Sequence, residues 1–323
     1  MKSIPPSDTR IIDMDASTLS HAVHEKHVSC REVMNATLDR IAELNPHYNA
    51  IVSLQDADLL LAQADERDFQ LAQNISMGWM HGMPQAIKDL SDTAGIVTTH
   101  GSPLLQDFIP ATDSLMVQRM KKSGCIVVGK TNTPEFGLGS HTFNELFGIT
   151  RNAYDATLSA GGSSGGAAVA LALRLLPVAD GSDFMGSLRN PAGWNNVFGF
   201  RPSQGRVPMW PTQDTWMAQL GTEGPMGRTV QDVARLLDVQ AGFDERSPLS
   251  ISDGMRFNAP LGGFDGKDVR IAWLGDLSGY LPMEHGILDI CEQGLARLQS
   301  LGCAVEPTAF GTPPENVWQS WLG

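Results

Sequence analysis

The chain contains Ser-Ala-Gly-Gly-Ser-Ser-Gly-Gly at residues 159–166, and Gly-Ser-Asp-Phe-Met-Gly-Ser-Leu-Arg-Asn-Pro follows at residues 181–191. Glycine packs no side chain and costs backbone entropy, so such runs mark unusual dihedral angles or a close approach of the backbone. The first segment enters residues 167–175, which are rich in alanine and leucine and typical of a buried helix. A glycine turn before a helix gathers free N–H donors at one point. A flexible linker fits less well, because a linker does not run directly into an apolar helix.

The composition is that of a globular protein. The chain has 323 residues, of which 42% are hydrophobic and 18% charged, enough for one large domain or two ordinary ones. Its net charge of -13 argues against nucleic acid as the main ligand, because an acidic surface repels phosphate. Cysteines 30, 125, 291 and 303 show neither close pairing nor metal-ligand spacing, which predicts free thiols in the cytoplasm and no metal. We expect neither a signal peptide nor a membrane span.

Short strands alternate with helices, which predicts an α/β fold with a covered sheet. The clearest helix start is Ser29-Cys-Arg-Glu32, a capping box. The clearest strand is the apolar segment 83–87, which ends at Lys88. The other predicted elements are two helices within 15–46, a helix at 114–122, strands at 125–128 and 177–180, a surface loop at 240–268, and a β-α-β unit at 269–274, 284–301 and 303–305.

Two motifs match known catalytic loops in spacing but lack their context. Residues 124–131 have the spacing of a phosphate-binding loop, yet the residues between the glycines are apolar and strand-like, and we interpret the match as a coincidence. Residues 161–165 match the nucleophile elbow of α/β-hydrolases, with Ser163 as nucleophile. That fold needs a strand before the serine and a later acid and histidine. Residues 157–160 are a poor strand, and His285 is the only later histidine, so the elbow is the weaker alternative.

A serine hydroxyl is a weak nucleophile and needs a base. Histidine is the usual base, but none is well placed in this chain. A lysine can serve if burial disfavours its charged form and lowers its pKa. Lys88 ends the apolar run Met-Pro-Gln-Ala-Ile, in a chain with only seven lysines. The alternative is an ordinary surface lysine at the end of a strand.

Six segments, taken in order, resemble the motifs of the amidase signature family. Several ordered motifs together are far more specific than one glycine run. They are residues 82–89 (Gly-Met-Pro-Gln-Ala-Ile-Lys-Asp), 98–102 (Thr-Thr-His-Gly-Ser), 129–137 (Gly-Lys-Thr-Asn-Thr-Pro-Glu-Phe-Gly), 159–166, 181–189 and 199–208 (Gly-Phe-Arg-Pro-Ser-Gln-Gly-Arg-Val-Pro).

The resemblance implies an α/β fold with a large, mixed, twisted β-sheet covered by helices on both faces. We expect a single domain over residues 1–323. It would comprise an N-terminal helical segment at 1–79, a signature core at 80–210 and the start of a C-terminal portion at 211–323. Members of the family generally continue well past the point where this chain stops, so we expect part of that portion to be missing.

The resemblance also implies a Ser-Ser-Lys triad. Ser187 would be the nucleophile, Ser163 the bridging serine held by a cis peptide bond after Gly162, and Lys88 the base. Ser164 would help to orient Lys88. The implied reaction is hydrolysis of a carboxylic amide through an acyl-enzyme, without metal or organic cofactor.

The segment before the nucleophile would bind the oxyanion through the N–H groups of Phe184, Met185, Gly186 and Ser187. Asp183 and Arg189 would pair to brace the loop, and Leu138, Gly139 and Met185 would line the substrate pocket. The family usually has two glycines before the nucleophile, and Met185 takes the place of the first.

Two alternatives to a small-molecule amidase stay open. One is the glutaminase-type subunit of a tRNA-dependent amidotransferase, which shares these motifs. The other is a non-catalytic binding protein that keeps the fold. The expected partner is a small-molecule amide, with no nucleic acid, no membrane and a homodimer as the assembly. The sequence does not name the amide.

Overall fold

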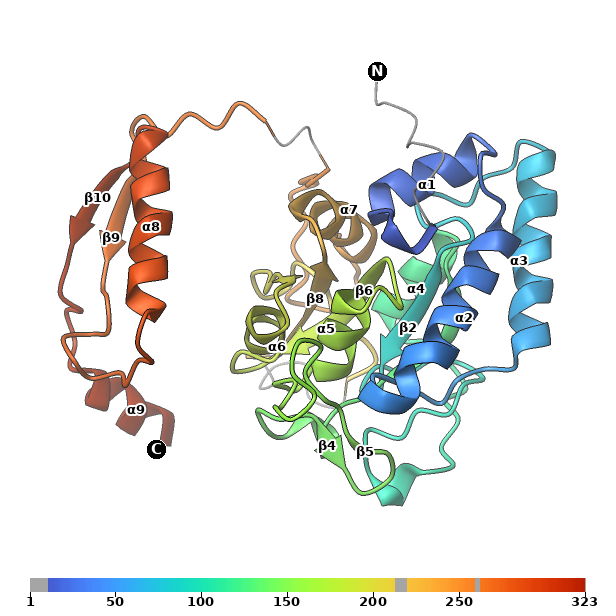
Figure 1. Cartoon of the computed structure of the whole chain (residues 1–323), viewed down its shortest axis with the longest axis horizontal. Coiled ribbons are helices and arrows are strands. Elements are labelled where there is room, and N and C mark those ends of the chain that lie inside the picture. The colour runs from blue at the N-terminus through green and yellow to red at the C-terminus, as the bar shows by residue number, and fades with distance from the viewer. Residues whose placement is uncertain (1–10, 213–219, 259–261, 323) are drawn as a thin grey trace. The chain divides into compact units, whose positions relative to one another are not determined.

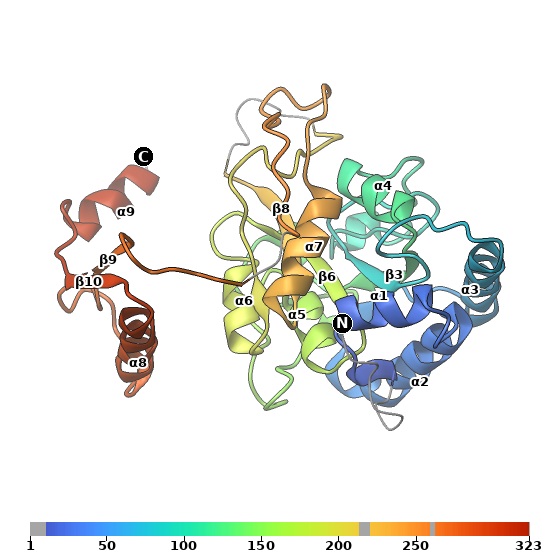
Figure 2. The same cartoon turned by 90° about the horizontal axis from the view of Figure 1, so that it is seen from above.

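The structure is a computed structural model that describes residues 11–212, 220–258 and 262–322. The chain divides into two compact units, residues 1–259 and 260–323, which we describe separately. Figures 1 and 2 show the elements of each unit.

The first unit is built on two three-stranded sheets. In one, β3 lies between β1 and β2, parallel to β2 and antiparallel to β1. In the other, β8 lies between β6 and β7 and is antiparallel to both. Strands β2 and β6 contact each other although they belong to different sheets, so the two sheets meet at this edge. A short hairpin of β4 and β5 stands apart. The strands are β1 (Ile51–Val52), β2 (Pro84–Lys88), β3 (Ile126–Thr131), β4 (Phe143–Asn144), β5 (Gly148–Ile149), β6 (Val178–Asp183), β7 (Phe198–Gly199) and β8 (Thr222–Gly227).

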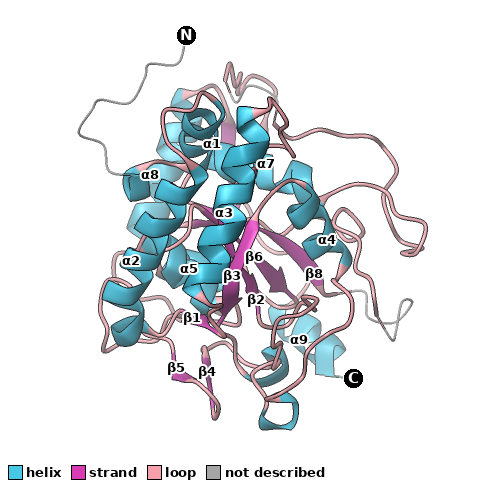
Figure 3. Cartoon of the chain, turned by 90° about the vertical axis from the view of Figure 1, so that its right-hand side faces the viewer, coloured by secondary structure: helices cyan, strands magenta, loops and turns pink. Residues whose placement is uncertain are grey.

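Helices cover both faces of these strands (Figure 3). The capping box predicted at Ser29 and Glu32 is confirmed at the start of α2, where each residue's side chain accepts from the other's backbone N–H. The α-helices of this unit are α1 (Ala16–His24), α2 (Cys30–Tyr48), α3 (Ala57–Ala72), α4 (Leu115–Lys122), α5 (Gly165–Ala172), α6 (Arg189–Trp194) and α7 (Val230–Gln240), and its 3₁₀ turns are η1 (Ile11–Asp13), η2 (Pro103–Leu105) and η3 (Glu135–Gly137).

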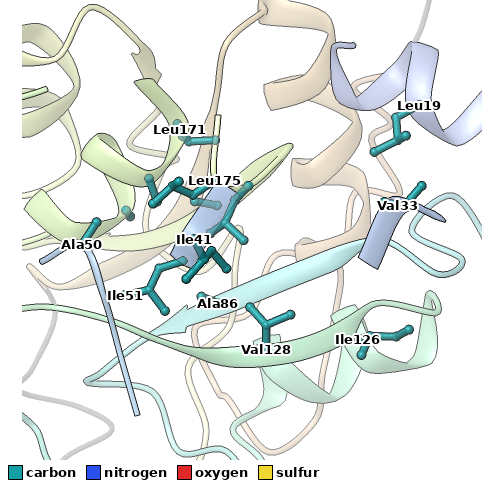
Figure 4. Packing of buried hydrophobic residues seen from close by; sticks show 14 of the residues in the cluster. Leu19, Val33, Ile41, Ala50, Ile51, Ala86, Ile126, Val128, Leu171 and Leu175 are labelled. Atoms are coloured by element: carbon teal, nitrogen blue, oxygen red, sulfur yellow. The ribbon is translucent and has the colours of Figure 1, made fainter. Parts of the chain in front are cut away.

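Alternation along β2 and β3 explains the two layers of helices, because successive side chains of a strand point to opposite faces. Ala86, Ile126 and Val128 join a cluster with residues of α2, α3 and α5 (Figure 4). Ile87 and Val127 face the other way, into a cluster with α4 and α7. Two separate apolar cores therefore fix the sheet edge where Lys88 ends β2.

Helix α5 starts at the glycine-serine segment and is buried over residues 165–171. Gly165 and Gly166 allow this close approach: a Cβ atom on Gly166 would lie 2.4 Å from the Asn132 nitrogen and 2.6 Å from the Ala50 oxygen. Both contacts are with backbone, which cannot swing away as a side chain can. The glycines predicted to mark close backbone approach therefore do so here.

The second unit is a β-α-β unit followed by a helix. Strand β10 (Ala304–Pro307) pairs in parallel with β9 (Arg270–Trp273), and α8 (Ile287–Ser300) connects them. Helix α9 (Pro314–Leu322) follows. The predicted β-α-β unit is thus confirmed with small shifts of its ends.

The predicted mixed α/β fold is confirmed, with strands divided among several hydrogen-bonded sheets. The prediction of a single domain, with boundaries near residues 80 and 211, stays a prediction. In the three described ranges, no helix combines the length and apolar character that crossing a membrane requires.

We expect Gly166→Ala to lower the free energy of unfolding by about 3 kcal/mol or more, because overpacking costs about 1–3 kcal/mol even where neighbours can move. Gly193, in α6, has no atom within 4 Å of a built Cβ, so Gly193→Ala is the matched control. It should be neutral or stabilising by up to about 1 kcal/mol. Denaturant unfolding of both variants measures the difference, and equal midpoints would contradict the close approach.

Candidate active site

Lys88, the last residue of β2, has a fully buried side chain. Its Nζ donates to Ser163 Oγ at 2.8 Å, to Ser164 Oγ at 2.8 Å and to Ser182 Oγ at 2.9 Å. No carboxylate of the described residues forms an ion pair with this amine. A hydroxyl can accept or donate, so three hydroxyls can hydrogen-bond to either the charged or the neutral amine.

Burial lowers the pKa of Lys88 to about 7, because a low-dielectric surrounding disfavours the ammonium form. The negative charges of Asp180, Asp183 and Glu223 act in the opposite direction and raise this pKa. The balance leaves a large fraction of neutral amine at neutral pH. A buried neutral amine in contact with a serine hydroxyl can act as a general base.

The glycine-serine segment positions the two serines. The peptide bond between Gly162 and Ser163 is cis, as the resemblance implied. Thr142 Oγ1 donates to the Gly161 carbonyl and accepts from the Gly165 N–H, which ties both ends of the segment to one side chain. Turns and an isolated bridge, not a strand, precede the serines, so the nucleophile-elbow alternative loses the strand that it requires.

The segment of residues 181–191 joins this site through its backbone. Ser164 N–H donates to the Ser187 carbonyl at 3.1 Å, and Ser164 Oγ contacts both backbone groups of Ser182. Ser187 is partly buried, whereas Ser163 and Ser164 are buried. The structure therefore brings the two predicted segments together around Lys88.

Asp183 braces the loop, as predicted. Its buried carboxylate accepts from the N–H groups of Gly186 and Leu188, and Arg189 donates to both of its oxygens at 3.0 Å. Arg201, which the sequence did not single out, adds an ion pair at 3.3 Å. Burial alone would raise the pKa of Asp183, but the hydrogen bonds from Arg189, Gly186 and Leu188 outweigh it, and this pKa is lowered.

The predicted oxyanion donors need one correction. The Gly186 N–H points at Asp183 Oδ1, at 2.8 Å, and this bond removes it from the donors open to a substrate. Among the described residues, the N–H groups of Met185 and Ser187 have no such acceptor. The N–H groups of Met185 and Ser187 therefore remain as predicted donors, and the role of Phe184 stays a prediction.

The predicted pocket residues lie at the surface. Leu138 is 81% exposed and Met185 is 55% exposed, and Gly139 is exposed as well. Gly137 connects this segment to the site, because a Cβ built on it would lie 3.7 Å from Ser163 Oγ. Because Met185 is exposed, its side chain does not pack in the core beneath the loop.

Sequence reasoning missed Ser182 and Asp180, both on β6. Ser182 is the third hydroxyl on Lys88, and Asp180 accepts from the Lys88 backbone N–H at 3.0 Å. The two lie two residues apart in one strand and so share a face. Polar residues at alternate positions of a buried strand were the signal that could have found them.

A family model described as Amidase matches residues 32–321. The chain belongs to the amidase signature family. It is 35% identical over 312 residues to an acylamidase of Rhodococcus erythropolis, covering 96% of this chain and 65% of the relative. It is 37% identical over 276 residues to the A-type subunit of a Glutamyl-tRNA(Gln) amidotransferase from Pseudomonas syringae pv. tomato, covering 81% of this chain and 56% of the relative.

Solved structures give the same picture. A bacterial aryl acylamidase of the amidase signature family superposes with a TM-score of 0.89 at 32% identity, covering 95% of this chain and 64% of that one. A peptide amidase from Stenotrophomonas maltophilia gives 0.80 at 29% identity, covering 98% of this chain and 65% of that one. This amidase-family chain thus spans about two thirds of the length of these proteins.

Proposed function

We propose that this chain carries the catalytic centre of an amide hydrolase, with Ser187 as nucleophile, Ser163 as proton carrier and Lys88 as base. One observation carries the proposal: the amine of Lys88 is fully buried and in contact with the hydroxyls of Ser163, Ser164 and Ser182. A structural lysine would normally reach solvent or a carboxylate.

The proposed reaction starts with neutral Lys88. As Ser187 Oγ attacks the amide carbon, its proton passes to Ser163, and the Ser163 proton passes to Lys88 Nζ. A C–O bond forms and a tetrahedral oxyanion results. When the C–N bond breaks, Ser163 gives a proton to the leaving amine and recovers one from Lys88. Water then hydrolyses the acyl-enzyme by the same proton route.

The N–H groups of Phe184, Met185 and Ser187 are the proposed donors to the oxyanion. One such donor contributes about 3 kcal/mol to transition-state stabilisation when it is correctly placed. Asp183 supports this role indirectly, because it holds Gly186 and Leu188 on either side of the nucleophile.

The proposed substrate is a linear carboxylic amide with a small-molecule acyl group. The similarity to an acylamidase and to an aryl acylamidase supports this class. We also propose a cytoplasmic location, on the basis of four free cysteines. A homodimer stays a prediction.

The similarity to glutamyl-tRNA(Gln) amidotransferase subunits, at 36–40% identity, favours a second candidate: a glutaminase subunit that acts with a partner. The net charge of -13 weighs against work beside tRNA. Glutamine hydrolysis that rises only when a partner subunit is added would favour the second candidate. A non-catalytic binding protein, in contrast, would hydrolyse no amide under either condition.

We expect Ser187→Ala to abolish both amide turnover and covalent labelling by a fluorophosphonate, with the thermal unfolding curve unchanged. The reason is that the nucleophilic oxygen is lost while Asp183 still holds the loop. Ser159→Ala, outside the triad in the same pair of segments, is the control and should still be labelled. Labelling that persists in Ser187→Ala and maps to Ser163 would instead support the elbow alternative.

We expect Lys88→Ala to lower kcat/KM by several orders of magnitude, without rescue by Lys88→Arg, because arginine stays protonated and cannot accept a proton. In the wild-type protein kcat/KM should fall as pH drops below about 7, because the amine whose pKa lies there gains its proton. Lys122→Ala, on α4, is the control. A pH-independent rate between about pH 5 and 9 would count against Lys88 as base.

We expect Met185→Gly to change substrate preference more than stability. Removing an exposed side chain beside the nucleophile should favour bulkier acyl groups by about 1–3 kcal/mol in relative kcat/KM. Met116→Ala, at a fully buried position, is the stability control and should cost about 2–5 kcal/mol. The measurements are kcat/KM for a small and a bulky acyl amide and the melting temperature. An unchanged ratio with a large drop in melting temperature would refute pocket lining.

A further inference from the structure

Glu223 is a buried carboxyl, 6% exposed, for which the proposed mechanism has no role. It lies on β8 directly opposite Ser182 in the antiparallel pair β6–β8. Directly opposed residues project their side chains from the same face of a sheet. Ser182 Oγ contacts Lys88 Nζ at 2.9 Å. The Glu223 side chain therefore leaves β8 on the same face of the sheet as the Ser182 side chain, which is the face toward the Lys88 amine.

A second connection runs through the turn after β2. Ser91 Oγ donates to Glu223 Oε1 at 2.8 Å, and the Ser91 N–H donates to the Lys88 carbonyl at 3.0 Å. The carboxyl of Glu223 therefore holds the turn that leaves β2 directly after Lys88. Ser91 thus links Glu223 to the Lys88 backbone, and Ser182, the residue paired with Glu223 across the two strands, contacts the Lys88 amine.

The other carboxylates near Lys88 are each bonded to strong or multiple donors. On β6, Asp183 binds two arginines and backbone N–H groups, and Asp180 binds the backbone of Lys88 and the Gln85 amide. After β2, Asp89 binds the backbone and hydroxyl of Thr99. A nearby charged group that is not a carboxylate is Lys130 of β3, which donates to the Ser91 carbonyl and to the Thr93 hydroxyl.

Glu223 differs from these groups, because the only donor to its carboxyl among the described residues is the neutral hydroxyl of Ser91. Burial raises the pKa of Glu223 to about 7, and burial lowers the pKa of Lys88 to about 7. The two groups therefore titrate over the same pH range, and the charge of each one affects the pKa of the other.

We propose that Glu223 is a positioning residue for the amidase reaction: it anchors the Lys88 turn through Ser91, and its negative charge, together with those of Asp180 and Asp183, raises the pH at which the Lys88 amine becomes available as a base. The inference rests on the proposed function, because it assigns a partner to the proposed base. Glu223 touches neither substrate nor reacting atoms.

The test is the acid limb of the pH profile of kcat/KM for an uncharged amide. Glu223→Gln keeps the length of the side chain and an acceptor for Ser91 but removes the charge. Without that charge protonated Lys88 is less stable, so the midpoint should move to lower pH. Glu223→Asp should move it back toward the wild-type value. Glu66→Gln, an exposed position on α3, is the matched control and should leave the midpoint in place.

A Glu223→Gln variant with the wild-type midpoint overturns the inference, even if its plateau rate falls, since a purely structural role changes the plateau alone.

If that variant does not fold, the Ser91→Ala variant provides the test. Losing the donor to Glu223 favours its neutral form and should shift the limb in the same direction by a smaller amount, and an unshifted limb overturns the inference. Wild-type protein without amide turnover would instead refute the proposed function and this inference with it.

Discussion

The structure depends on keeping one lysine amine out of water. Burying an ammonium ion costs several kcal/mol even after relaxation, so a fold that buries Lys88 must supply polar partners or accept a neutral amine. Here the partners lie 75 to 94 residues after the lysine in the sequence: Ser163 and Ser164 before α5, and Ser182 in β6. The contact of β2 with β6, the close approach at Gly166 and the two apolar clusters all serve to bring those segments to the lysine.

The carboxylates near this amine form their hydrogen bonds with other groups. No carboxylate of the described chain pairs directly with Lys88 Nζ. Such an ion pair would stabilise the protonated amine. Carboxylates instead bond to its backbone, to a neighbouring turn and to the loop beyond it. Lys130 is a second buried lysine, with a pKa lowered by burial to about 8. Among the residues that the structure describes, it donates only to the Ser91 carbonyl and the Thr93 hydroxyl. Residues 124–131 match a phosphate-binding loop in spacing, but their lysine, Lys130, is a buried residue of strand β3.

Much of this arrangement could be predicted from local sequence. The capping box at Ser29, the apolar strand before Lys88 and the glycines before α5 each act over a few residues, where composition is informative. Glu223 could not be predicted, because its partner Ser91 is 132 residues away and only the register of β6 with β8 brings it to the site. The prediction that the Gly186 N–H binds the oxyanion fails for a related reason. This N–H donates to the Asp183 carboxylate, and the loop conformation that brings the two together could not be read from the sequence. Helices α3 and α7 were not predicted.

The bracing of the loop at residues 183–189 has a consequence for sequence variation. Asp183 fixes the path of the loop from inside, through Gly186, Leu188 and the arginines, while the side chains of Phe184 and Met185 point outward and are about half exposed. The residues that hold the loop in place are therefore different from the residues that it exposes. Under the proposed function, substitutions at position 185 are therefore the ones expected to change the acyl preference while the bonds of Asp183 stay in place.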